Sequence, residues 1–281
     1  MNKTLKASVA IFLGMYLPIQ SSGQQASAAR YSLLHAAPKE QMRDMETDRP
    51  DVTESPITVD AGHFQYETDL VRRIRERTEQ EQISTILINQ LNLKIGITNT
   101  ADFHVGFQSY GRQVVKGSSS QIKETSTGYG DLTLRIKQNL LGNDRGDFAL
   151  AVLPYLRMPT SKFDDGSRLE GGLILPMQYK LPREWRLGFQ LEVDRLKDQD
   201  QQAMHTEWLQ SLTLSHSLFR NLGGMAETYY TYDFKAHQWS NYLNASLQMD
   251  VAKDVKIDAG VNYGIQSTAE KHYFVGASCR F

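Results

Sequence analysis

The feature that most constrains this chain is an alternation of apolar and polar residues, with a period of two, which runs from Gly62 to the end of the sequence. Between residues 185 and 194, for example, Leu187, Phe189 and Leu191 alternate with polar side chains. A period of two is typical of a β-strand with one apolar face. Twelve such segments follow one another, at residues 64–70, 83–95, 102–108, 131–137, 148–158, 170–181, 185–194, 207–218, 222–232, 239–249, 255–263 and 272–281.

The connections between these segments also alternate in length. Short turns are expected at 98–100, 142–146, 182–184, 220–221 and 252–254, and mostly longer polar loops at 75–82, 111–127, 160–167 and 197–203. Short periplasmic turns opposite longer external loops, together with an even number of strands, are typical of bacterial outer-membrane barrels. The sequence therefore predicts an all-β fold, a transmembrane antiparallel β-barrel of about 12 strands. Mean hydropathy is negative, which is compatible with a barrel because only alternate residues face lipid.

The first 61 residues lack this alternation and divide into two parts. Lys3 and Lys6, an apolar stretch at 7–19 and the small residues 26–28 predict a secretory signal peptide over residues 1–28, with a cut after Gly23 as an alternative. Residues 29–61 are predicted to be an irregular lead-in, either docked in the barrel lumen or forming a periplasmic linker. Residues 62–281 would then form the barrel in the bacterial outer membrane.

The closing strand is predicted at 272–281. Tyr273, Val275 and Phe281 lie on its apolar face, whereas Gly276 and Arg280 lie on the other. This strand must pair with the strand that begins near Gly62. We expect Phe281 to anchor the strand at the periplasmic interface, in contact with outer-membrane lipid. The one cysteine, Cys279, has no partner for an internal disulfide.

Charges on the polar faces would point into the barrel. The expected lumen-lining residues are Glu67, Asp69, Lys94, Asp131, Arg135, Lys137, Arg186, Glu192, Glu227, Lys256, Asp258 and Arg280; Glu207 belongs to the same faces. Such charges either pair and fill a narrow lumen or line an aqueous path, and both remain open here. Their mixed signs argue against strong ion selectivity. The segments 148–158 and 170–181 are apolar on both faces, so their lumen-facing positions are not assigned.

Catalytic, cofactor-binding and metal-binding residues are not expected. The sequence holds no motif for a serine hydrolase, a zinc peptidase, a phosphate loop or a dinucleotide site. His216 has Leu214 and Leu218 as its neighbours on the outward face, which favours an interfacial role over catalysis. Lys and Arg total 31 against 32 for Asp and Glu, without clustering, so no nucleic-acid partner is expected.

One stretch resembles a known family. Residues 47–56, Thr-Asp-Arg-Pro-Asp-Val-Thr-Glu-Ser-Pro, are followed by Gly62, Gln65 and Glu67 at the spacing of the outer-membrane transporters named after the meta-pathway of phenol degradation. Gly128, Gly130 and Asp131 match a second motif of that family. The resemblance covers most of residues 47–281. It implies an outer-membrane channel for hydrophobic or aromatic compounds and supplies no catalytic or binding residues. By likeness to other outer-membrane barrels, it also implies that Phe281 is recognised by the barrel-assembly machinery.

The expected function is passive passage of small molecules, hydrophobic or aromatic by that resemblance, across the outer membrane. The alternative is a structural or adhesive barrel with a closed, salt-bridged lumen.

Overall fold

The computed structural model describes residues 31–78, 80–117, 121–163, 168–198, 203–266 and 268–281, which form one antiparallel barrel. The signal peptide predicted for residues 1–28 lies outside the described residues. No helix in the described part of the chain is long and apolar enough to cross a membrane.

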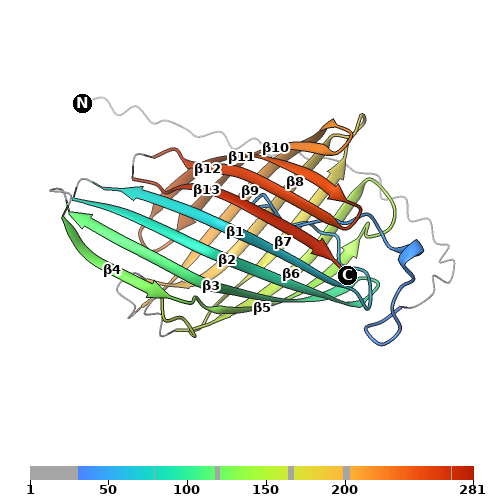
Figure 1. Ribbon diagram of the computed structural model, residues 1–281, viewed down its shortest axis with the longest axis horizontal. Coiled ribbons are helices and arrows are strands. Elements are labelled where there is room, and N and C mark those ends of the chain that lie inside the picture. The colour runs from blue at the N-terminus through green and yellow to red at the C-terminus, as the bar shows by residue number, and fades with distance from the viewer. Residues whose placement is uncertain (1–30, 79, 118–120, 164–167, 199–202, 267) are drawn as a thin grey trace, which may run out of the picture.

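The barrel wall is built mainly from consecutive hairpins, coloured from teal at β1 to red at β13 in Figure 1. The strands are β1 (Phe64–Arg77), β2 (Glu81–Thr98), β3 (Ala101–Gly117), β4 (Ile122–Gly128), β5 (Leu132–Leu141), β6 (Phe148–Met158), β7 (Glu170–Lys180), β8 (Arg186–Lys197), β9 (Met204–Phe219), β10 (Leu222–Asp233), β11 (Gln238–Ala252), β12 (Val255–Gly264) and β13 (Lys271–Arg280). Each strand pairs with the next one in the chain, except that β5 pairs with β3 instead of β4, and β1 pairs with β13.

The sheet contains thirteen strands, but only twelve positions surround the lumen. β3 is long enough to pair with β5 through residues 101–107 and with β4 through residues 111–116. The prediction of a twelve-stranded antiparallel barrel is therefore confirmed. The predicted loop at 111–127 is wrong, because most of it continues β3 and forms β4. The segment at 111–127 is polar, but hydrogen bonding between the backbones of paired strands does not depend on side-chain polarity. Such a sequence can therefore form strands wherever little apolar surface has to face lipid.

Burial along the strands confirms the alternation. On β13, the side chains of Tyr273 and Val275 are exposed on the outer face, whereas Phe274 and Gly276 are buried on the inner face. Closure of the barrel is fixed by Phe281, whose backbone N–H donates to the carbonyl of Phe64 over 2.8 Å. The ring of Phe281 remains 66% exposed, as expected for a side chain at the membrane interface.

Residues 31–63, here called the lead-in, enter from the end of the barrel that holds the C-terminus and the short turns (Figure 1). The short 3₁₀ helix η1 (Lys39–Gln41) lies outside that end. We call this the turn end and the opposite one the loop end. Beyond η1 the chain enters the barrel, and it returns to the turn end to begin β1. Ser32 and Gly62 each contact the β2–β3 end of the wall, through Thr98 and Gly96.

Candidate functional site

The lumen is occupied by residues 45–61 of the lead-in, and this segment makes most of the polar contacts of the interior. Met45, Asp48, Thr53 and Ser55 are buried although they belong to no helix or strand. Irregular backbone inside a membrane protein needs partners for its N–H and C=O groups, and here the polar inner faces of the strands supply them.

One side of the lumen is basic, and two acidic residues of the lead-in face it. Lys137 Nζ donates to Asp48 Oδ1 over 2.8 Å, and Lys94 bridges Asp48 and Glu67. Arg135 Nη1 lies 2.5 Å from Glu54 Oε1. Burial opposes ionisation of Asp48, but Lys137 and Lys94 hold the pKa of Asp48 well below its usual value. Asp48 is therefore an ionised carboxylate held between two buried lysines.

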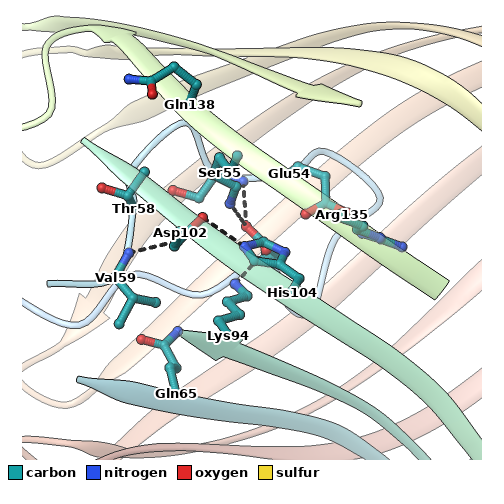
Figure 2. Close-up of polar contacts among 12 residues, drawn as sticks. Glu54, Ser55, Thr58, Val59, Gln65, Lys94, Asp102, His104, Arg135 and Gln138 are labelled. Carbon is teal, nitrogen blue, oxygen red and sulfur yellow. Dashed lines mark hydrogen bonds and ion pairs between the residues drawn. The ribbon is translucent and has the colours of Figure 1, made fainter. Parts of the chain in front are cut away.

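The same basic side contains a buried Asp–His pair (Figure 2). Asp102 accepts a hydrogen bond from the backbone N–H of Val59 over 2.7 Å, and its other oxygen lies 2.9 Å from Nε2 of His104. Lys94, His104 and Arg135 are neighbours in the register of β2, β3 and β5. Asp102 thus fixes the returning arm of the lead-in to the wall at the level of Lys94, His104 and Arg135.

The adjoining part of the lumen wall, on β1, β13 and β12, is acidic and binds the one arginine of the inserted segment. Arg49 Nη1 lies 2.5 Å from Asp69 Oδ1, and Nη2 lies 2.6 Å from Asp258 Oδ1. Gly276 stands between these two aspartates in the register of β1, β13 and β12. Since a Cβ at position 276 would collide with the Arg49 guanidinium, glycine is what lets Arg49 reach both carboxylates.

Glu227 of β10 binds the tip of the lead-in. Its carboxylate accepts hydrogen bonds from the backbone N–H groups of Val52 and Thr53, over 2.9 and 2.8 Å, and from Thr53 Oγ1 over 2.6 Å. Asn244 donates to the same carboxylate over 2.8 Å, and Ser211 Oγ lies 2.6 Å from Thr53 Oγ1. We call these five residues, Val52, Thr53, Ser211, Glu227 and Asn244, the septum.

The septum lies between two cavities. The first, of about 590 Å³, opens at the turn end and is lined by Thr213 of β9, Met225 of β10 and Ser246 of β11. The second, of about 610 Å³, opens at the loop end and is lined by Glu207, Tyr229 and Tyr242 of the same three strands. On each strand a septum residue lies between the two sets: Ser211, Glu227 and Asn244 respectively. A solute moving along these three strands from one cavity to the other would meet this contact.

The predicted lumen-lining residues divide into two groups. Those that contact the lead-in are Glu67, Asp69, Lys94, Arg135, Lys137, Arg186, Glu227, Asp258 and Arg280. The other three bond to the wall or its loops: Asp131 accepts hydrogen bonds from Thr160 and Ser161, Glu192 accepts one from Gln190 and also faces Glu54 of the lead-in, and Lys256 pairs with Asp250. Glu207 lines the loop-end cavity. The wall charges therefore pair mainly with the lead-in rather than with one another.

Some residues of the site were not singled out from the sequence. Asp48, Arg49, Thr53 and Glu54 belong to the motif at 47–56, and the wall positions are Asp102, His104, Ser211, Asn244 and Gly276. The alternation had placed those wall residues on polar faces. Their selection requires the path of an irregular segment, and local periodicity carries no information about that path.

Comparison with known proteins gives the following matches. A family model described as "Putative MetA-pathway of phenol degradation" matches residues 47–281. An outer membrane channel from Pseudomonas putida F1 superposes with a TM-score of 0.62 at 12% identity, over 84% of this chain and 100% of that chain. The NanC porin gives a TM-score of 0.49 at 9% identity, over 76% of this chain and 98% of that one. No curated protein sequence matches. The likeness to the Pseudomonas putida channel shows a shared outer-membrane barrel fold.

Proposed function

The chain belongs to the family of the MetA-pathway of phenol degradation, and on that basis we propose that it is a channel for small solutes, closed at rest by its lead-in. The family description and the fold of the Pseudomonas putida channel support a channel role. The observation that carries the proposal is the pair of cavities that approach each other from opposite ends and are separated by the septum.

The septum is a contact that can be broken without unfolding the barrel. Its members from the lead-in, Val52 and Thr53, lie in a segment without strand pairing, whereas its wall members lie in continuous ladders. Hydrogen bonds to a charged group each contribute about 1.5–3 kcal/mol, so the bonds to Glu227 hold the tip firmly but reversibly. Opening requires the tip to leave Glu227, after which the two cavities join into an aqueous path.

The test is conductance in planar bilayers together with swelling of liposomes in small sugars. We expect low conductance for the chain beginning at residue 29, and a severalfold increase for a variant lacking residues 31–61. Glu227→Gln provides a second variant that keeps the shape of the side chain and weakens its acceptors. Glu184→Gln is the matched control, because Glu184 lines the turn-end cavity outside the septum. If the two opened variants show no conductance and no solute uptake, the channel proposal is refuted.

The alternative function, a structural or adhesive barrel with a closed interior, is favoured by one observation. The lumen contains buried ion pairs between the lead-in and several strands of the wall, among them Lys94–Asp48 and Arg49–Asp258. Such a network would also serve a barrel that never opens. The same conductance experiment separates the two functions, since a permanently closed barrel stays silent after Glu227→Gln.

We further propose export with a cleaved signal peptide over residues 1–28, and recognition of Phe281 by the barrel-assembly machinery. The apolar stretch at 7–19 supports the first. The exposed ring of Phe281 beside the β1–β13 seam supports the second. The solute class proposed is small and hydrophobic or aromatic, which rests on the family description. N-terminal sequencing of the outer-membrane form would give the cleavage site.

A further inference from the structure

The outer face of the barrel carries a group of basic residues near the loop end, over the four adjacent strands β13, β1, β2 and β3. We call it the basic face, and its members are Arg73, Arg75, Arg77, Arg112, Lys116 and Lys271. Five of them are exposed, and Lys271 lies over the ring of Tyr263 at 4.5 Å. None of the described residues on this face in the loop-end half of the four strands is an Asp or a Glu.

The register shows that these side chains point away from the lumen. Arg73 pairs with Tyr273 on one side and with Ile86 on the other, and both of those side chains are exposed. The preceding residue, Arg72, pairs with the buried Phe274 and Leu87 and therefore points inward. A bulge between Asp69 and Val71 sets this phase.

The basic face borders the apolar surface of the wall. Arg73 and Arg112 flank Ile86 in the register, and Ile88 and Tyr110 form the next outward pair towards the middle of the barrel. In the other direction, Arg75 pairs with Lys271, and Arg77 and Lys116 flank Gln82. The basic residues thus lie in three rows across the strands, at the levels of Arg73, Arg75 and Arg77. At about 3.3 Å per residue, these rows cover roughly 13 Å along the strands, beginning where the apolar surface ends.

The inward arginines are paired within the protein, whereas the cations of this face are not. The inward arginines Arg49, Arg72 and Arg135 all form ion pairs. Among the described residues, Arg73, Arg75, Arg77, Arg112 and Lys116 form no ion pair or side-chain hydrogen bond. A row of arginines beside lipid without internal partners is suited to phosphate, which the guanidinium binds through paired hydrogen bonds.

We propose that the basic face binds the phosphate groups of lipopolysaccharide in the outer leaflet. The proposal rests on the outer-membrane orientation of the proposed function, in which the loop end faces outward. Charge complementarity selects this occupant: the face is uniformly cationic, it borders the apolar surface, and a phosphorylated glycolipid offers anionic groups at that boundary. Acyl chains would pack on Ile86, Ile88 and Tyr110 while the phosphates pair with the flanking arginines.

The experiment measures binding of diphosphorylated lipid A to the refolded protein in detergent by calorimetry. The variant Arg73→Gln/Arg75→Gln/Arg112→Gln should lower affinity at least tenfold, and the wild-type affinity should fall as salt rises. The matched control, Arg145→Gln/Lys180→Gln/Lys253→Gln, removes three exposed cations from the turn end and should bind as the wild type does. Should the triple variant fail to refold, Arg75→Gln alone is expected to weaken binding severalfold.

Two outcomes would overturn the proposal: unchanged affinity in the loop-end variants, or equal affinity for lipid A from which the phosphates have been removed. Conductance of the same variants in the background lacking residues 31–61 keeps the two hypotheses apart. Loss of lipid A binding with unchanged conductance supports lipid A binding by the basic face, whether or not the channel proposal holds. Unchanged binding with high conductance refutes the basic face alone.

Discussion

The guanidinium of Arg49 lies over the backbone of Gly276, in the space that a side chain at position 276 would fill. Asp69 and Asp258 flank Gly276 in the register and both bind this guanidinium. The arrangement joins a residue of the lead-in to three strands of the wall, including both strands of the closing seam. The contact of Arg49 with the two aspartates therefore depends on a glycine at position 276.

Gly276→Ala should therefore loosen the lead-in. The added methyl group expels the guanidinium from between the two aspartates, and removing one partner from a buried ion pair costs up to about 3–5 kcal/mol. We expect more frequent channel opening in planar bilayers. The variant barrel should still be folded, as judged by the difference in gel mobility between unheated and heated samples. Gly223→Ala is the control, because a methyl group there meets only ordinary contacts. An alanine at 276 without any change in opening would show that Arg49 does not hold the lead-in.

Opening should also depend on pH through Glu54. Burial, reinforced by Asp48, raises the pKa of Glu54 to about 7 in spite of Arg135. In the undocked lead-in the pKa returns to its ordinary value of 4.5. The docked state binds the proton more tightly, so docking is strongest below pH 4.5 and weakens as the pH rises through 7. Conductance should therefore increase between pH 5 and 8.

The variant Glu54→Gln removes this titration and should flatten the pH profile of opening. The groups that face Glu54 are Asp48, Arg135, Lys137 and Glu192, so some dependence will remain. A profile of wild-type steepness in Glu54→Gln would assign the titration to another group.

Two lysines on polar strand faces should differ in their effect on stability. Lys94→Met leaves Asp48 and Glu67 buried with one fewer cation, which should lower the free energy of unfolding by about 3–5 kcal/mol. Lys256→Met breaks a pair in which the side chain of Asp250 is 53% exposed, so the loss should stay within about 1 kcal/mol. Urea unfolding followed by tryptophan fluorescence measures both. Equal losses would mean that the lead-in adds little to the stability of the barrel.

Deletion of Phe281 should lower assembly more than it alters transport. The deletion removes the two backbone hydrogen bonds to Phe64 and the acceptor that His63 Nδ1 contacts over 2.9 Å. The amount of folded protein in outer-membrane fractions should fall severalfold, while the molecules that do insert should conduct as the intact protein does. Phe281→Tyr keeps an interfacial aromatic and should restore assembly. Normal assembly of the deletion would refute recognition through this residue.

The strands were predictable because each carries its own signal. In a barrel wall every second side chain faces lipid, so Leu187, Phe189 and Leu191 reveal their strand without reference to any neighbour. The ends were less predictable. Residues 113–116 and 122–127 belong to strands although their polarity indicated a loop, because ladder pairing continues where the lipid-facing pattern has stopped. The basic face is visible in the sequence only as scattered arginines, and the bulge near Asp69 decides which of them point outward.

The sequence by itself determined the barrel, the faces of its strands and the set of charges on its interior, because a period of two is a local property. Tertiary structure alone decided which charges meet. Asp48 lies against Lys94 of β2 and Lys137 of β5, and Arg49 lies against Asp69 of β1 and Asp258 of β12. Those pairs join the lead-in to strands as much as 209 residues away. Neighbouring residues of one motif bind different strands of the wall because the segment lies inside the lumen, and no local pattern encodes that path.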